Sequence, residues 1–235
     1  MGRWGRALIQ QAIRKNEEAG EGLLGKACEK LERAIKIKAD NWETCFDCGY
    51  AFCLLASVRD NIEAEALFKR ACDKFEMALK IEPANCTVLS YLGYTLSRWA
   101  ERKDGEEAKE LFAEAHQKYE QAAELKPDDF ANLNSWGGSL LEQADKETGK
   151  KRKDLLEEAR KKFLKAEDIK QASGAYNLAC MCGLEEDEDG CRRWLEIGED
   201  AGSLPNRERA MTDDDLESVR DKEWFAEIRW GSGER

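Results

Sequence analysis

The sequence repeats itself with a period of 44 residues, which restricts the chain to a tandem-repeat fold. Three stretches align without gaps, beginning at Glu32, Glu76 and Glu120. A period of this length indicates stacked supersecondary units, each of which buries its apolar face against its neighbours. Four alanines keep the period and form a first repeat signature: Ala34, Ala78, Ala122 and Ala166.

A second signature consists of Gly49, Gly93 and Gly137, each about one turn into an apolar segment. Counting back once more reaches Gly5, where the local sequence around Trp4 resembles that around Gly137. We therefore expect the chain to begin inside a helix, in a first repeat that is incomplete at its N-terminus.

Each unit is expected to contain two helices, because apolar residues recur at steps of three and four. Asn41 and Asn85 stand where a helix N-cap is needed, and Pro83 and Pro127 follow helix ends. We expect first helices over 42–59, 86–102 and 130–146, and second helices over 64–81, 106–125 and 155–169.

These patterns predict an all-α, right-handed α-solenoid of about five antiparallel helix pairs with a C-terminal capping segment. An atypical last repeat is expected, since the final unit must cover an exposed apolar face. The expected division is 1–41, 42–85, 86–129 and 130–171 for four repeats, 172–204 for a short fifth repeat, and 205–235 for the cap and tail.

The repeat resembles the tetratricopeptide motif, whose usual period is 34 residues. The residues that carry the resemblance in the third unit are Leu89, Leu92, Gly93, Leu96, Ala115, Tyr119, Ala122 and Pro127. Here ten residues are added around the turn inside each unit. The resemblance implies that small residues let helices approach and that aromatic residues fill the gap between adjacent pairs.

Two further resemblances cover parts of the chain. The segment from Asn132 to Glu142, with Trp136-Gly137-Gly138 at its centre, is similar to the plant-type mitochondrial import receptor. That family is tail-anchored, whereas this sequence has no apolar run of the ~20 residues that span a bilayer. Residues 173–229, including Tyr176, Trp194 and Trp224, resemble the segment that closes many bacterial tetratricopeptide arrays.

Composition excludes several classes of function. The net charge is −11, and an acidic protein repels phosphate backbones, so nucleic acid is not an expected partner. Nine cysteines without a disulfide-like spacing favour a reducing, cytoplasmic compartment. Direct membrane insertion is not expected, although association with a membrane-bound complex remains open.

The sequence contains no pattern that predicts catalysis or a cofactor. Cys45 and Cys48 could suggest zinc, but the only histidine is His116, and a structural zinc site needs four converging ligands. We interpret these cysteines as small core residues and expect no metal. The acidic run 185–189 and the basic run 150–153 are interpreted as solvated turns that attract one another.

In solenoids of the family that the chain resembles, the first helix of each pair lines the concave face. This family pattern places the candidate ligand-binding residues there: Phe46, Tyr50, Ser90, Tyr94, Arg98, Asn134, Leu141 and Tyr176. An aromatic face with few dispersed cations suits an amphipathic helix or an apolar peptide better than a carboxylate. Alternatively, a second layer of helices or a neighbouring chain covers this face.

The sequence thus predicts a non-catalytic interaction scaffold or adaptor that binds another protein or peptide. One alternative is a structural subunit of a larger, membrane-associated complex, attached through Trp224, Phe225 and Trp230. The other is a targeting-sequence receptor of the import-receptor type. The oligomeric state is left open.

Overall fold

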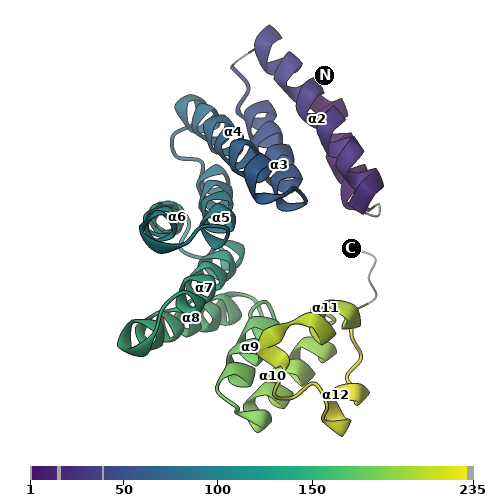
Figure 1. The fold of residues 1–235 in the computed structure, drawn as a ribbon, viewed down its shortest axis with the longest axis vertical. Coiled ribbons are helices and arrows are strands. Elements are labelled where there is room, and N and C mark those ends of the chain that lie inside the picture. The colour runs from purple at the N-terminus through teal and green to yellow at the C-terminus, as the bar shows by residue number, and fades with distance from the viewer. Residues whose placement is uncertain (1, 15–16, 39, 232–235) are drawn as a thin grey trace. The chain divides into compact units, whose positions relative to one another are not determined.

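The computed structural model describes residues 2–14, 17–38 and 40–231. Parts of the expected first repeat and tail, namely residues 1, 15–16, 39 and 232–235, lie outside the described residues. The chain divides into two compact units, Met1–Pro127 (unit 1) and Asp128–Arg235 (unit 2). The described helices are shown in Figure 1: α1 Gly2–Ile13, α2 Glu17–Ile37, α3 Trp42–Ser57, α4 Asn61–Ile81, α5 Cys86–Glu101, α6 Gly105–Leu125, α7 Phe130–Asp145, α8 Gly149–Ile169, α9 Ala175–Leu184, α10 Glu188–Asp200, α11 Arg207–Thr212, the 3-10 helix η1 Asp214–Leu216, and α12 Glu223–Glu227.

The helices pack in successive pairs, α1 with α2 through α9 with α10, which confirms the expected all-α fold class. Asn41, Asn85 and Asp129 cap the first helices α3, α5 and α7 by accepting backbone N–H groups. Each of these helices has 16 residues, and each following second helix has 21. None of the described helices combines the length and the apolarity that a membrane crossing requires.

The second helices begin earlier than the sequence suggested, because the turn inside each unit is short. Asp60 accepts hydrogen bonds from the N–H groups of Ile62 and Glu63, both at 3.1 Å. At the equivalent turns Gly105 and Gly149 adopt positive φ angles of 62° and 60°, a region that favours glycine. Each second helix is therefore about 31 Å long at 1.5 Å per residue.

The repeat glycines bring the two helices of one pair together. A Cβ atom at Gly137 would lie 2.5 Å from the ring of Phe163, and one at Gly93 would lie 3.1 Å from that of Tyr119. The expectation placed the aromatics between adjacent pairs; the structure shows each ring over the glycine of its own pair. Of the signature alanines, Ala78, Ala122 and Ala166 are buried, and Ala34 is half-buried.

The basic run 150–153 is also placed differently from the prediction. It forms the start of α8 instead of a turn, because Lys and Arg are good helix formers on an exposed face. Lys151 pairs with Glu147 and Arg152 with Asp145, which offsets the unfavourable position of cations at a helix N-terminus. The acidic run forms the turn between α9 and α10 together with the first two residues of α10, and its Glu185 pairs with Arg160 of α8.

The C-terminal elements close unit 2 with a separate apolar core. Leu195, Leu216 and Phe225 are fully buried in it, and Trp224 and Trp230 pack against it. Asp213 caps η1: its carboxylate accepts a hydrogen bond from the N–H of Asp215 at 3.2 Å.

Candidate functional site

Three aromatic side chains meet on the first helices of unit 1. Phe46 and Tyr50 lie one turn apart on α3 and stack at a centroid distance of 6.4 Å. Tyr91 of α5 meets both rings edge-on, at 5.0 Å from Phe46 and 5.3 Å from Tyr50. We call Phe46, Tyr50 and Tyr91 the aromatic cluster.

The 44-residue repeat explains why Tyr50 and Tyr91 of the aromatic cluster lie next to each other. Arg6 of α1 bonds Asp47 of α3 through Nε at 3.0 Å, and the pair Tyr50–Tyr91 is the same pair of positions 44 residues later. Contacts between consecutive first helices therefore fall at fixed positions on one face. The same face is ionic at the first junction and aromatic at the second.

The cluster is half-buried and uncharged. Burial, with smaller contributions from Tyr91 and Tyr94, raises the pKa of Tyr50 to about 12. Burial also raises the pKa of Tyr91. Both phenols therefore stay protonated near neutral pH, and the face offers ring surface and hydroxyl groups, not phenolates.

The other candidate residues of unit 1 lie around the cluster. Tyr94 is 36% exposed, and Ser90 is half-buried. Arg98 forms an ion pair with Glu101 at 2.6 Å, one turn further along α5. The only basic residue among these candidates therefore has a carboxylate partner within its own helix.

The candidates of unit 2 are engaged within that unit. Asn134 donates a hydrogen bond from its amide to the carbonyl of Ser173 at 2.8 Å, which ties α7 to the turn before α9. Tyr176 donates its hydroxyl to Asp213 at 2.7 Å. Leu141 is half-buried in α7. These side chains hold the fold of unit 2, so the binding geometry is best developed in unit 1.

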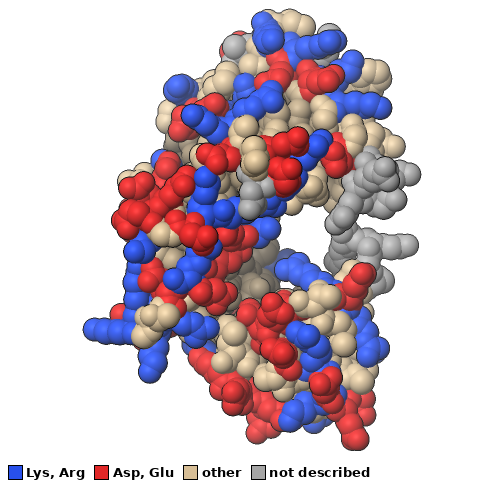
Figure 2. Space-filling view, viewed as in Figure 1, with Lys and Arg blue, Asp and Glu red and all other residues tan. Residues whose placement is uncertain are grey.

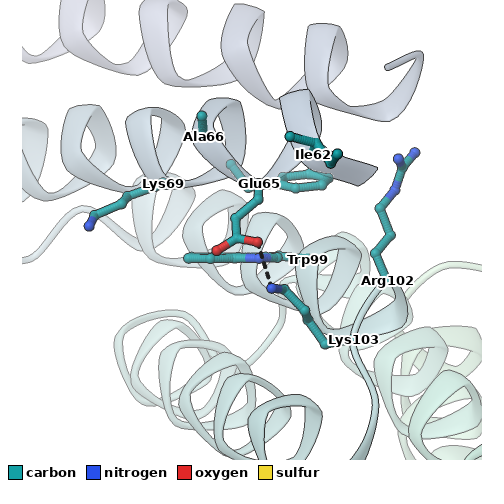
Figure 3. Close-up of a pocket in the computed structure, with 8 residues that line it drawn as sticks. Ile62, Glu65, Ala66, Lys69, Trp99, Arg102 and Lys103 are labelled. Atoms are coloured by element: carbon teal, nitrogen blue, oxygen red, sulfur yellow. Dashed lines mark hydrogen bonds and ion pairs between the residues drawn. The ribbon is translucent and has the colours of Figure 1, made fainter. Parts of the chain in front are cut away.

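Apart from the aromatic cluster, unit 1 has a hollow where the second repeat meets the third, with a volume of about 480 Å³. Figure 3 shows the carboxylate of Glu65 from α4 beside the indole of Trp99 from α5, where it meets Lys103. Arg102 donates two hydrogen bonds to the carbonyls of Ser57 and Arg59 at 2.8 and 2.7 Å. The hollow is thus the outer edge of a repeat junction held by charged side chains.

Seven of the nine cysteines are buried, and Cys72 and Cys86 are half-buried. Cys45 and Cys48 are fully buried on α3, and burial raises the pKa of both thiols. Among the described residues, only Cys180, Asp213 and Asp215 come together as three possible metal ligands. Asp213 there already accepts the hydroxyl of Tyr176 and the backbone N–H of Asp215.

Successive helix pairs in which a glycine of one helix packs against an aromatic ring of the other define a tetratricopeptide-type helical-repeat protein. At the level of families, residues 49–129 match the model described as plant-specific mitochondrial import receptor subunit TOM20. This match confirms the resemblance of the lengthened repeats to that receptor family over 81 residues, which hold Tyr50, Tyr91 and Tyr94. The segment Asn132–Glu142, on which the sequence resemblance was based, lies outside the matched residues. No curated protein matches the chain in a direct comparison of sequences.

Solved structures agree on the fold. The structure of Pseudomonas aeruginosa pilF superposes with a TM-score of 0.58 at 18% identity, covering 89% of this chain and 80% of that one. Yeast Tom70 also matches, at 14% identity over 83% of this chain and 60% of that one, with a TM-score of 0.31. At these identities the pilF match supports the fold, and the Tom70 score is too low to add to it.

Sequence reasoning missed Tyr91 and the flanking Trp42, whose ring lies 6.5 Å from that of Phe46. The useful signal was the 41-residue offset between Arg6 and Asp47, which recurs between Tyr50 and Tyr91. This offset becomes visible only once the first helices are known to lie side by side.

Proposed function

We propose that the chain is a non-catalytic interaction scaffold that binds an amphipathic helix or an apolar peptide on the first-helix face of unit 1. The observation that carries the proposal is the aromatic cluster, which offers three adjoining rings across two helices. Aromatic residues are enriched among those that dominate binding energy, because they bury a large area with few rotatable bonds.

The charges on the same face favour a helix over an acidic tail. Arg6 and Arg98 are paired with Asp47 and Glu101, so neither is a spare cation for a carboxylate group. On the side drawn in Figure 2, acidic and basic side chains are interspersed, without a continuous basic stripe. An apolar stripe of the ligand would cover the rings, and its polar face would stay in water.

A targeting-sequence receptor is the more specific candidate, favoured by the match of residues 49–129 to the import-receptor family. Targeting peptides for mitochondria are amphipathic, rich in arginine and poor in acidic residues. This candidate predicts preference for a basic polar face on the bound helix. It also places the protein beside a membrane-bound complex in a reducing compartment, in keeping with its nine free cysteines.

The alternative of a structural subunit attached through the C-terminal aromatics has less support. Phe225 is fully buried within the cap, and Trp224 donates a hydrogen bond to Glu188 at 2.9 Å. These side chains serve the core of unit 2 itself. The cap therefore offers no apolar patch comparable to the aromatic cluster among the described residues.

The test uses fluorescence anisotropy with a labelled 16-residue helical peptide that has Leu at steps of three and four and Arg on its polar face. In the full chain, Tyr50→Ala with Tyr91→Ala should weaken binding by about tenfold or more, since hot-spot aromatics contribute on this scale. Tyr94→Ala, at an exposed position, should weaken binding without affecting the fold.

Leu164→Ala is the matched control, because Leu164 is an exposed apolar residue of unit 2. Circular dichroism checks that each variant remains helical. Equal binding by the folded double variant would overturn the proposed site, and equal binding of a scrambled peptide would overturn the helix as ligand. A peptide with Glu on its polar face separates the two candidates: the receptor requires it to bind less tightly.

A further inference from the structure

The hollow where the second repeat meets the third has an apolar floor. Ala66 and Phe68 of α4 and the indole of Trp99 of α5 line it. Phe68 is buried, and Trp99 is half-buried. Its volume of about 480 Å³ comes within the range that is typical of ligand pockets, which are mostly apolar with a few polar groups. The floor therefore offers ring surface to an apolar side chain.

Ile62 extends this floor toward the solvent. It lies in the first turn of α4 and is 88% exposed. Its register equivalents in α2 and α6 are Glu18 and Glu106, and the positive end of the helix dipole favours a carboxylate there. Isoleucine is also a poorer helix former than glutamate. Formation of α4 therefore does not explain an isoleucine at this exposed position.

Two cations flank the hollow without a carboxylate partner among the described residues. Arg102 bonds only the neutral carbonyls of Ser57 and Arg59. Lys69 also lines the hollow, and it forms no ion pair with any residue that the structure describes. Figure 3 shows Lys69 on one side of Glu65 and Arg102 on the other. The apolar floor thus lies between two unneutralised positive charges.

The third cation of the hollow already binds carboxylates. Lys103 meets Glu65 at 2.6 Å and Glu107 at 3.0 Å. The side chain of Glu65 is 50% exposed, and its carboxylate lies beside the indole of Trp99, as Figure 3 shows. The indole Nε1 is buried and has no acceptor in the described part of the chain. Even with Glu107 counted, cations outnumber carboxylates here, although the whole chain carries −11.

The junction before this one lacks these features. The register equivalents of Lys69 and Arg102 there are Gly25 and Val58. The two repeats pack all the same, with α2 on α3 as α4 packs on α5. Packing of consecutive repeats therefore does not require the two cations, and their charge is available to a ligand.

We propose that this hollow binds an acidic segment of a partner protein in which one apolar or aromatic side chain stands between carboxylates. The apolar side chain would cover Trp99 and Ile62, and the carboxylates would face Lys69 and Arg102. Charge complementarity selects this occupant, because a neutral or basic peptide would leave both cations unpaired. The hollow shares no residue with the aromatic cluster, so one chain would join two partners.

The experiment measures fluorescence anisotropy of a labelled peptide, Gly-Asp-Glu-Phe-Glu-Asp-Gly, with the full chain. Ile62→Glu should weaken binding by about tenfold or more, because it removes a central apolar contact and adds a repelling charge. Lys69→Glu should also weaken it. Glu65→Gln should strengthen binding by about twofold to fivefold, the scale of an exposed charge pair, since it removes the one carboxylate among the lining residues. A merely structural role of Glu65 does not predict this gain.

Ile37→Glu is the matched control, because it changes an apolar side chain of α2 that is 73% exposed and should leave binding unchanged. Ile62 is equally accessible, so its variant should stay folded, as circular dichroism will verify. The peptide with Asn and Gln in place of its acids should bind about tenfold more weakly or worse, since it lacks the charges that the cations attract.

The proposal is overturned if the acidic peptide fails to bind at millimolar concentration, or if the neutral peptide binds equally well. Unchanged binding by folded Ile62→Glu, or weaker binding by Glu65→Gln, would also contradict it. Light scattering covers the remaining occupant: a dimer that Ile62→Glu converts to monomer would show that a second copy of the chain takes the hollow, and would overturn a partner of another sequence.

Discussion

At the scale of single residues, the fold depends on glycines that lie beneath large side chains. Gly49 faces Phe75, Gly93 faces Tyr119, and in both pairs a Cβ atom would lie 3.0–3.1 Å from the ring. Such a contact is tighter than most packed side chains make, so the glycine allows the close approach of the two helices of a pair. In α7, by contrast, Gly138, the residue after the repeat glycine Gly137, faces open space.

This contrast gives a matched pair of substitutions in one helix. Gly137→Ala should lower the free energy of unfolding by about 1–3 kcal/mol, because its Cβ would lie 2.5 Å from Phe163. Gly138→Ala should raise it by about 0.5–1 kcal/mol, since alanine favours a helix where space allows. Urea unfolding followed by circular dichroism measures both, and a stabilised Gly137→Ala variant would contradict the packing described here.

One carboxyl group makes unit 2 sensitive to pH. Burial, followed by the charges of Asp213, Asp145 and Asp214, raises the pKa of Asp215 to about 7 from 3.8. Between these values the folded protein retains a proton that the unfolded chain has lost. This group therefore lowers the free energy of unfolding as the pH rises from about 4 to about 7.

Replacing Asp215 by Asn removes that dependence. The difference in unfolding free energy between Asp215→Asn and the unchanged protein should grow in favour of the variant as the pH rises from about 4 to about 7. Urea titrations at several pH values measure it, and Asp221→Asn on the exposed surface of the cap is the control. A difference that stays constant over this range would show that the carboxyl is not perturbed.

At the scale of elements, a side chain of the third repeat caps a helix of the second. Arg102, after α5, donates to the carbonyls of Ser57 and Arg59 at the end of α3. The last carbonyls of a helix have no partner within it, so the guanidinium stabilises the end of α3 and links the two repeats. The link is directional, because the third repeat completes the second.

Arg102→Ala should therefore destabilise unit 1 by about 1.5–3 kcal/mol, the usual range for hydrogen bonds that involve a charged group. Lys69→Ala serves as its control, since Lys69 lines the same hollow but is an exposed side chain, where substitutions usually cost less than about 0.5 kcal/mol. Thermal unfolding compares the melting temperatures of the Arg102→Ala and Lys69→Ala variants. Equal melting temperatures would exclude the cross-repeat link.

Much at this scale follows from the sequence alone. The 44-residue period located the starts of α3, α5 and α7, and the Gly and Ala signatures marked the faces that meet. The start of α8 was expected too late because the basic residues at 150–153 suit a turn as well as an exposed helix. The partners of Asn134 and Tyr176 could not be predicted, since they lie in a turn and a cap outside the repeat register.

At the scale of the whole molecule, the chain combines a regular repeat unit with a capped one. Unit 1 provides an uncharged aromatic cluster on its first helices. Unit 2 directs its equivalent polar side chains into its own hydrogen bonds and closes its core with α11, η1 and α12. Among the described residues, the surfaces that we propose for partners therefore lie in unit 1.

The most direct test of the central claim, that the first-helix face of unit 1 binds an amphipathic helix, is hydrogen–deuterium exchange of the full chain with and without the labelled peptide. We predict slower exchange in α3 and α5, which carry Phe46, Tyr50 and Tyr91, with little change in α9–α12. Protection confined to unit 2, or to the second helices α4 and α6 with α3 and α5 unchanged, would contradict the account.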